Sequence, residues 1–283
     1  MTECAWDHVY LYSGDRCSVL IEEAAWGQAA EAGAGAGPRA SHAAAELDGE
    51  LWLAGGLSFQ STANLSKLAK YNPASGKWSE VAYELGPDEI DPLANRYDHS
   101  LGKLYLFGGV VGEQNISSEL WQFDPAALKW TLLTSESSNP GRLPYHAAGH
   151  TATVVGHVML VIFGYNQHWG YPNTVQEYHF KNGSWLGGSA SCWVNGTYGH
   201  SAVPDPVTGS VYVFGGYHDG DSSAAGQVKD QLLIYYPWNR TWVVGAKSGR
   251  QLFRHAATFL GGRMLVVGGN GHNSTQASQP TVI

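Results

Sequence analysis

The sequence predicts an all-β fold built from repeated four-stranded units, and three features carry this prediction. A run of strand-forming residues that ends in glycine recurs along the chain, with the glycine at positions 55, 108, 164, 215 and 268. The steps between these glycines are 53, 56, 51 and 53 residues. A histidine precedes the run in all five units, and an aromatic–tryptophan pair follows it in the first four. Self-similarity at a nearly fixed period is the mark of a repeat architecture.

A period near 50 residues is the length of a kelch-type β-propeller blade, and the composition is consistent with that fold. The chain has 283 residues, of which 43% are hydrophobic, only 14% are charged and 36 are glycine. Short strands joined by many turns use residues in this way. The net charge is -8 and no basic run accompanies it, so we expect no nucleic-acid partner.

Membrane insertion by this chain is also not expected. The longest uninterrupted apolar run covers residues 158–163, which is far short of the ~20 residues that span a bilayer. Residues 1–7 lack the basic start and the apolar core of a signal peptide. Three cysteines, Cys4, Cys17 and Cys192, are too few for a disulfide framework.

Each unit is predicted to begin with the innermost strand of a blade. That strand starts at a histidine and continues with small or branched residues, which suit the crowded centre of a propeller. The histidines are His42, His99, His150, His200 and His255. Because two-residue hairpins need positive φ, we expect turns at Asp48-Gly49, Gly156-His157, Thr208-Gly209 and Gly261-Gly262. The next strand is apolar on both faces, which predicts burial between neighbouring blades.

The third and fourth strands carry aromatic pairs whose members are seven residues apart. The pairs are Tyr71 with Trp78, Phe123 with Trp130, Tyr178 with Trp185, and Tyr235 with Trp242. Turn-forming residues lie between the two members of each pair. We interpret these pairs, like the histidines, as structural repeat residues that pack blade against blade. The alternative is an aromatic ladder that binds a ligand.

Two irregularities indicate that the propeller is incomplete. The distance from the histidine to the glycine is 13 to 15 residues in four units but only 9 in the second, from His99 to Gly108, which predicts a stunted inner strand. The fifth unit ends before its aromatic and tryptophan strands. We therefore expect four full blades and half of a fifth over residues 38–276, with residues 277–283 as a C-terminal tail.

Several stretches resemble the kelch propeller of the attractin family. They include Asn95-Arg96-Tyr97-Asp98-His99-Ser100, Tyr198-Gly199-His200-Ser201 and Phe253-Arg254-His255-Ala256-Ala257. The match covers most of residues 38–276. Residues 1–15 resemble the latter part of a CUB domain, and residues 16–37 resemble the end of an EGF-like module followed by a glycine- and alanine-rich linker. Both modules are incomplete, so the chain is similar to a fragment of such a protein.

The resemblance implies a non-enzymatic, extracellular or cell-surface module, because attractin-like proteins are large glycoproteins linked to cell interaction and receptor regulation. It implies a protein partner bound by the propeller loops, and no cofactor. The alternative is an intracellular kelch adaptor, either muskelin-like or a ubiquitin-ligase substrate receptor. A third reading is a propeller enzyme such as a copper-radical oxidase, which needs a tyrosine crosslinked to cysteine, and Cys192 is the only cysteine inside the repeats.

Six N-x-S/T sequons are candidate N-glycosylation sites. They are Asn64, Asn115, Asn182, Asn195, Asn239 and Asn273. All fall where the repeat predicts loops: after the glycine pair, at the turn between the third and fourth strands, or after the fourth strand. The alternative is that asparagine is frequent there only because hairpin turns favour it.

The loops after the glycine pairs project from one rim and form the predicted partner-binding surface. Residues 166–171 make an aromatic loop, and residues 217–231 make the longest one. The candidate contact residues are His168, Trp169, Tyr171, Tyr217 and His218. The alternative is that they serve only local packing of long loops. No H-x-H, C-x-x-C or H-E-x-x-H motif occurs, and we expect no bound metal.

Overall fold

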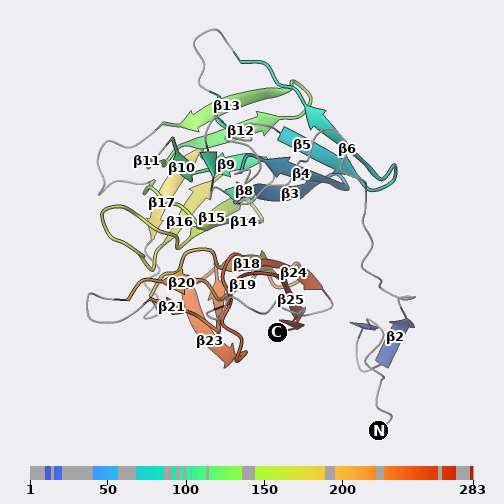
Figure 1. The fold of residues 1–283 in the computed structure, drawn as a ribbon, viewed down its shortest axis with the longest axis vertical. Coiled ribbons are helices and arrows are strands. Elements are labelled where there is room, and N and C mark those ends of the chain that lie inside the picture. The colour runs from blue at the N-terminus through green and yellow to red at the C-terminus, as the bar shows by residue number, and fades with distance from the viewer. Residues whose placement is uncertain are drawn as a thin grey trace.

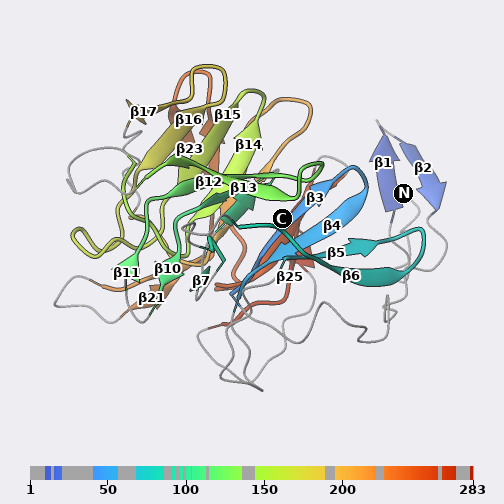
Figure 2. The same ribbon diagram turned by 90° about the horizontal axis from the view of Figure 1, so that it is seen from above.

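The protein folds into five β-sheet blades arranged around a common centre (Figures 1 and 2). The computed structural model describes residues 10–13, 16–20, 41–56, 68–85, 91–93, 96–97, 100–102, 104–112, 115–135, 144–188, 195–220, 226–260, 263–271 and 281–282. Strands, turns and irregular segments make up all of these residues, which confirms the predicted all-β, kelch-type propeller. Within the same ranges there is no helix with the length and hydrophobicity to cross a bilayer.

Blades 1 to 4 are four-stranded antiparallel sheets. Blade 1 contains β3 (Ala43–Leu47), β4 (Glu50–Ala54), β5 (Leu68–Asn72) and β6 (Lys77–Val81). Blade 2 contains β8 (Ser100–Gly102), β9 (Tyr105–Phe107), β12 (Leu120–Asp124) and β13 (Lys129–Thr134). Blade 3 contains β14 (Thr151–Val155), β15 (Val158–Ile162), β16 (Val175–His179) and β17 (Ser184–Gly188). Blade 4 contains β18 (Ser201–Pro204), β19 (Val211–Phe214), β22 (Gln231–Tyr236) and β23 (Thr241–Lys247).

Blade 5 has three strands, one more than the sequence led us to expect. They are β24 (Ala256–Leu260), β25 (Arg263–Val267) and β26 (Thr281–Val282). We assigned residues 277–283 to a tail, but Thr281 and Val282 pair with Val266 and Leu265. Both are strand-forming residues, and they satisfy backbone groups at the outer edge of β25 that would otherwise be open.

The innermost strand of each blade begins one residue after the repeat histidine, as β3, β14, β18 and β24 do. These strands and β8 face the centre of the propeller (Figure 1). In blade 2, β8 has only three residues, which agrees with the expected stunted strand. The first hairpin turn also has the expected geometry, because Asp48 and Gly49 take φ values of 53° and 78°.

Three smaller elements lie outside the blades. A hairpin joins β1 (Tyr10–Ser13) to β2 (Arg16–Leu20) and stands beside the propeller (Figure 2). This hairpin pairs residues of the segment that resembles a CUB domain (1–15) with residues of the segment that resembles an EGF-like module (16–37). On the propeller, β10 (Val110–Val111) pairs with β7 (Arg96–Tyr97) and β11 (Asn115–Ile116), and β20 (Tyr217–His218) pairs with β21 (Gln227–Val228). The strands β7, β10, β11 and β21 lie on one side of the propeller (Figure 2).

The aromatic residues seven positions apart are directly opposite each other on adjacent strands. The ring centroids are 5.2 Å apart in Tyr71–Trp78, 5.0 Å in Phe123–Trp130, 5.2 Å in Tyr178–Trp185 and 4.9 Å in Tyr235–Trp242. Some of them also reach the preceding blade. Trp242 stacks on Phe163 at 5.2 Å, and Trp185 lies 5.0 Å from Phe107.

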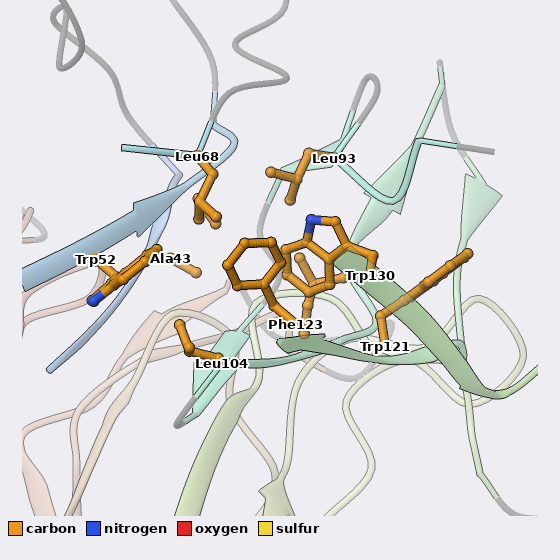
Figure 3. Close-up of a cluster of buried hydrophobic side chains, with 10 residues drawn as sticks. Ala43, Trp52, Leu68, Leu93, Leu104, Trp121, Phe123 and Trp130 are labelled. Carbon is orange, nitrogen blue, oxygen red and sulfur yellow. The ribbon is translucent and has the colours of Figure 1, made fainter. Parts of the chain in front are cut away.

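The contact between blades 1 and 2 shows how these rings form a core (Figure 3). Phe123 and Trp130 of blade 2 lie at the middle of the cluster, and Trp52 of blade 1 lies 6.0 Å from Phe123. Leu68 and Leu93 are fully buried beside these rings. Burial of an aromatic side chain removes 150–250 Å² from water, so such clusters are a main source of stability between blades.

A second contact between blades recurs near the centre and involves the repeat histidines. A phenylalanine at the end of the second strand packs edge-on against the histidine of the next blade. Phe107 and Phe214 precede the first glycine, whereas Phe163 takes the place of that glycine in blade 3, with φ of 51°. The three ring pairs are Phe107–His150 at 5.3 Å, Phe163–His200 at 5.4 Å and Phe214–His255 at 5.4 Å. We call this contact the phenylalanine–histidine lock.

Hydroxyl groups extend the lock in blades 3 to 5. Nδ1 of His200 lies 3.0 Å from the carbonyl oxygen of Thr197, so this nitrogen carries the proton and donates it. Nε2 then accepts a hydrogen bond from the Thr151 hydroxyl of the preceding blade at 3.1 Å. In the next blade Ser201 Oγ lies 2.8 Å from Nε2 of His255. Each hydroxyl follows the histidine of its own blade.

In blades 2 and 4 the first glycine of the pair is required by the same contact. A Cβ on Gly108 would lie 2.8 Å from Cε1 of His150, and a Cβ on Gly215 would lie 2.9 Å from Cε1 of His255. Both glycines also have positive φ. A larger residue at either position would therefore both clash with the histidine and strain the backbone.

The two ends of the blade series differ from its middle. His42, in blade 1, is exposed, whereas His150, His200 and His255 are buried. At the other end Val267 is 37% exposed, and a Cβ on Gly268 would meet no atom within 4 Å. His99 lies outside the described residues. Among the described residues the lock therefore joins blades 2 and 3, 3 and 4, and 4 and 5, and no such ring pair joins blades 1 and 5.

Burial keeps the locked histidines neutral. It lowers the pKa of His150 to about 3, and that of His200 and His255 to about 4. The unfolded chain, with an ordinary histidine pKa of 6.5, binds more protons below that pH than the folded chain does. Stability is therefore complete above pH 6.5 and is lost as the pH falls toward 4.

We expect the free energy of unfolding to fall by about 1 kcal/mol for each locked histidine between pH 7 and pH 5.5. Urea denaturation at several pH values measures this slope. Replacement of His255 by asparagine should reduce the slope, because it removes one of the three histidines whose pKa is lowered by burial. An unfolding free energy that does not vary over this range would contradict the neutral, buried state.

Candidate functional site

The candidate site lies on the rim where the second strand of each blade leads to the third. There the residue after the glycine pair, or after Phe163-Gly164 in blade 3, exchanges two backbone hydrogen bonds with the residue two positions before the histidine. The exchanged pairs are Ala148 with Tyr165, Tyr198 with Tyr217, and Phe253 with Asn270, at 2.8–3.0 Å. This repeated backbone pairing places the side chains of blades 3, 4 and 5 in one layer.

Aromatic side chains of that layer surround a pocket of about 390 Å³. Its lining consists of Tyr165, Tyr171, Tyr198, Tyr217, Phe253 and Arg254. We call it the tyrosine pocket. Tyr171 lies 5.3 Å from Tyr165 and 6.2 Å from Tyr217, and Tyr217 lies 6.0 Å from Phe253. The rings are half-buried, so they present aromatic surface to a ligand.

Opposite charges flank the tyrosine pocket. Nη2 of Arg254 donates to the phenol oxygen of Tyr198 at 3.0 Å, and its guanidinium lies 5.4 Å from the centre of that ring. On the other side, the phenol of Tyr217 donates to Asp219 at 3.2 Å. Burial, together with the nearby Asp219 carboxylate, raises the pKa of Tyr171 to about 12, so this phenol is protonated at neutral pH.

The loop beside the pocket is held by Asn166, whose side chain is only 2% exposed. Its amide nitrogen donates to the carbonyl of His146 at 2.7 Å, and its amide oxygen accepts from the backbone N–H groups of His168 and Trp169 at 2.8 and 3.3 Å. Backbone hydrogen bonds between Asn166 and Gly170 close the loop. Trp169 is thereby fixed at the surface, 47% exposed, with its ring 5.0 Å from Tyr145.

His218 connects the pocket to a candidate glycosylation site. Its Nδ1 lies 2.9 Å from the carbonyl of Gly196, so Nδ1 donates and Nε2 is left as an acceptor. Nδ2 of Asn195 lies 3.3 Å from that Nε2. The imidazole also packs 5.0 Å from Tyr171. The side chain of Asn195 is therefore adjacent to the wall of the tyrosine pocket.

The five candidate contact residues meet on this rim. His168 and Trp169 are exposed, while Tyr171, Tyr217 and His218 are half-buried. Five further residues of the rim are not among those predicted from the sequence: Tyr165, Tyr198, Phe253, Arg254 and Asn166. Four of these stand at fixed repeat positions, next to the histidine or the glycine pair, so a comparison of the units at those positions would have found them.

Four of the six sequons fall within the described residues. Asn115, Asn182, Asn195 and Asn239 are all exposed. Asn182 and Asn239 lie in the turns between third and fourth strands, at the end of the blades opposite the tyrosine pocket. Asn64 and Asn273 lie outside the described residues.

Other clusters of polar groups have structural partners. Glu177 is buried and accepts from the guanidinium of Arg240 at 2.7 and 3.0 Å and from the phenol of Tyr235 at 3.2 Å, which joins blades 3 and 4. A cavity of about 330 Å³ at the centre is lined by the histidines and small residues of the inner strands. Within the described part of the chain, no three His, Cys, Asp or Glu residues group to hold a metal ion. Cys192 lies outside the described residues.

A larger cavity of about 440 Å³ lies beside blade 4. Its walls mix Lys229, Lys247 and Asp230 with aliphatic and amide side chains, and no aromatic residue lines it. Flexible, charged side chains provide less rigid contact area than aromatic rings do. The tyrosine pocket is therefore the better candidate for recognition, although it is the smaller of the two.

The family model that matches the chain is the Attractin/LZTR1 beta-propeller, and the match covers residues 51–282. The chain belongs to this family. This confirms the resemblance drawn from the sequence motifs.

Two individual relatives are similar to most of the chain. The chain is 33% identical over 281 residues to the Caenorhabditis elegans protein tag-53, covering 94% of this chain and 20% of that protein. It is 31% identical over 236 residues to mouse multiple epidermal growth factor-like domains protein 8, covering 78% of this chain and 8% of that protein. The chain thus spans a fifth or less of the length of these two relatives.

Two other similarities are more distant. Human kelch domain-containing protein 3 is 27% identical over 203 residues, which is 68% of this chain and 51% of that protein. The solved structure of YjhT superposes with a TM-score of 0.69 at 16% identity, covering 87% of this chain and 81% of that one. The second likeness supports the fold alone.

Replacement of Asn166 by alanine should lower the free energy of unfolding by about 1–3 kcal/mol, because two N–H groups and one carbonyl lose their buried partner. Chemical denaturation measures the loss, and hydrogen exchange at the amides of His168 and Trp169 should accelerate. Replacement of the exposed His168 by alanine is the control and should change neither quantity. Unchanged amide protection in the Asn166 variant would contradict its role in holding the loop.

Proposed function

We propose that this propeller is a non-enzymatic, extracellular protein-interaction module of an attractin-like glycoprotein. The observation that carries the proposal is the aromatic rim, where the tyrosine pocket lies beside the fixed and exposed Trp169. Rigid aromatic side chains at the surface are the usual anchors of protein interfaces. A protein partner bound through His168, Trp169, Tyr171, Tyr217 and His218 fits this rim.

Exposure of the sequons supports an extracellular location. An N-linked glycan needs an accessible asparagine, and the four described sequon asparagines are all exposed. Glycans at Asn182 and Asn239 would leave the tyrosine pocket open, because these residues lie at the other end of the blades. A glycan at Asn195 would stand beside His218 and therefore beside the partner.

A second candidate function is that of an intracellular kelch adaptor. The similarity to kelch domain-containing protein 3 favours it, although the identity is lower than that to tag-53. Both functions would use the loop rim to bind a protein. They differ in whether the sequons carry glycans.

Mass spectrometry of the protein from cells that produce it, before and after N-glycosidase treatment, tests the location. We expect the enzyme to remove several glycans and to convert Asn115, Asn182, Asn195 and Asn239 to aspartate. Replacement of each asparagine by glutamine should abolish the mass change at that position only. A mass that N-glycosidase does not alter would contradict the extracellular function and favour the adaptor.

A further inference from the structure

One residue of the tyrosine pocket departs from the repeat that builds it. The residue before the histidine takes a left-handed backbone in four blades, with φ of 55° at Ser41, 61° at Gly149, 67° at Gly199 and 55° at Arg254. Glycine adopts this conformation without strain, as in blades 3 and 4. Arginine in the left-handed region costs about 1 kcal/mol. Blade 5 therefore carries a large cationic side chain where the fold itself is best served by glycine.

The side chain of Arg254 lies along the layer of the rim. Its Cγ would be 3.1 Å from a Cβ placed on Gly199, so the glycine of blade 4 makes room for the arginine of blade 5. The backbone N–H of Arg254 donates to the carbonyl of Gly199 at 2.6 Å, which fixes the start of the side chain. The end of the side chain is fixed by its hydrogen bond to Tyr198 and by two rings. The guanidinium lies 5.4 Å from the ring centre of Tyr198 and 6.0 Å from that of Phe253.

The rest of the pocket suits an apolar group. Five of its six lining residues contribute aromatic rings, and two of the phenols, those of Tyr198 and Tyr217, already take part in hydrogen bonds. A carbohydrate would need many polar partners in addition to ring stacking, whereas an aliphatic or aromatic side chain needs mainly apolar contact. The walls thus favour an apolar side chain, and Arg254 adds one positive charge at the edge.

We propose that the tyrosine pocket binds a protein segment in which an apolar side chain stands next to a carboxylate. The apolar side chain lies between the rings of Tyr171, Tyr217 and Phe253. The carboxylate pairs with the guanidinium of Arg254, which is exposed and matches the fork geometry of a carboxylate. Asp219 on the opposite side repels a second acidic group there, so the segment binds in one direction.

This inference rests on the proposed interaction function but has its own test. Random heptapeptides displayed on phage are selected on the immobilised full chain, and the enriched sequences are synthesised. We expect enriched peptides to combine an apolar residue with a neighbouring glutamate or aspartate. Replacement of that acid by glutamine should weaken binding about 10-fold or more, since a charge-assisted hydrogen bond contributes about 1.5–3 kcal/mol.

Replacement of Arg254 by glycine is the decisive variant, because glycine fits the left-handed backbone that blades 3 and 4 already use. The variant should melt at the wild-type temperature or above, and should bind the acidic peptide with the same 10-fold loss. It should bind the glutamine peptide as the wild type does. Replacement of Tyr171 by alanine should weaken binding of both peptides, since it removes a wall that the apolar side chain contacts.

Three results would overturn the proposal. One is a lack of any enriched peptide, and another is enrichment of peptides without an acidic residue. The third is wild-type affinity of the Arg254→Gly variant for the acidic peptide. Binding of chitin oligosaccharides in the same pocket would instead assign it to carbohydrate. None of these results depends on glycosylation, so failure of this inference is distinguishable from failure of the proposed extracellular function.

Discussion

The phenylalanine–histidine lock is the contact on which the remainder of the propeller depends. It joins blade 2 to blade 3, blade 3 to blade 4 and blade 4 to blade 5 near the centre, through Phe107–His150, Phe163–His200 and Phe214–His255. The ring pair requires a neutral, buried histidine, and after Phe107 and Phe214 it also requires a glycine. At these three junctions one contact therefore joins the glycine-ending strand of one unit to the histidine of the next, and both features repeat along the chain.

The lock also explains why the rim can carry a binding site. Immediately before each locked histidine, the chain pairs with the residue after the glycine pair, so both ends of the rim loops are fixed by the core. The backbone is the same in blades 3, 4 and 5, and the side chains are free to differ. At these positions the fold requires only backbone hydrogen bonds. The side chains there add aromatic surface, and they are Tyr165, Tyr198, Tyr217 and Phe253.

Much of this architecture could be predicted from the sequence, because repeated positions report repeated contacts. The repeat period predicted the blades. The short distance from His99 to Gly108 predicted the short β8, and the spacing of Tyr178 and Trp185 predicted a cross-strand pair. The third strand of blade 5 was missed, since Thr281 and Val282 follow no repeat signal. The tyrosine pocket was found only in part. Arg254 and Tyr198 stand at repeat positions just before a histidine, but their approach to Tyr171 follows from the meeting of three blades, which the linear sequence does not show.

A nitrogen-15 NMR titration of the histidine rings tests the lock most directly. Signals are assigned by single replacement of His150, His200 and His255. We expect these three rings to remain neutral from pH 8 down to pH 5, because burial lowers the pKa of each of them. Titration of the three rings near pH 6.5 in the folded protein would contradict the lock, and with it the fixed rim.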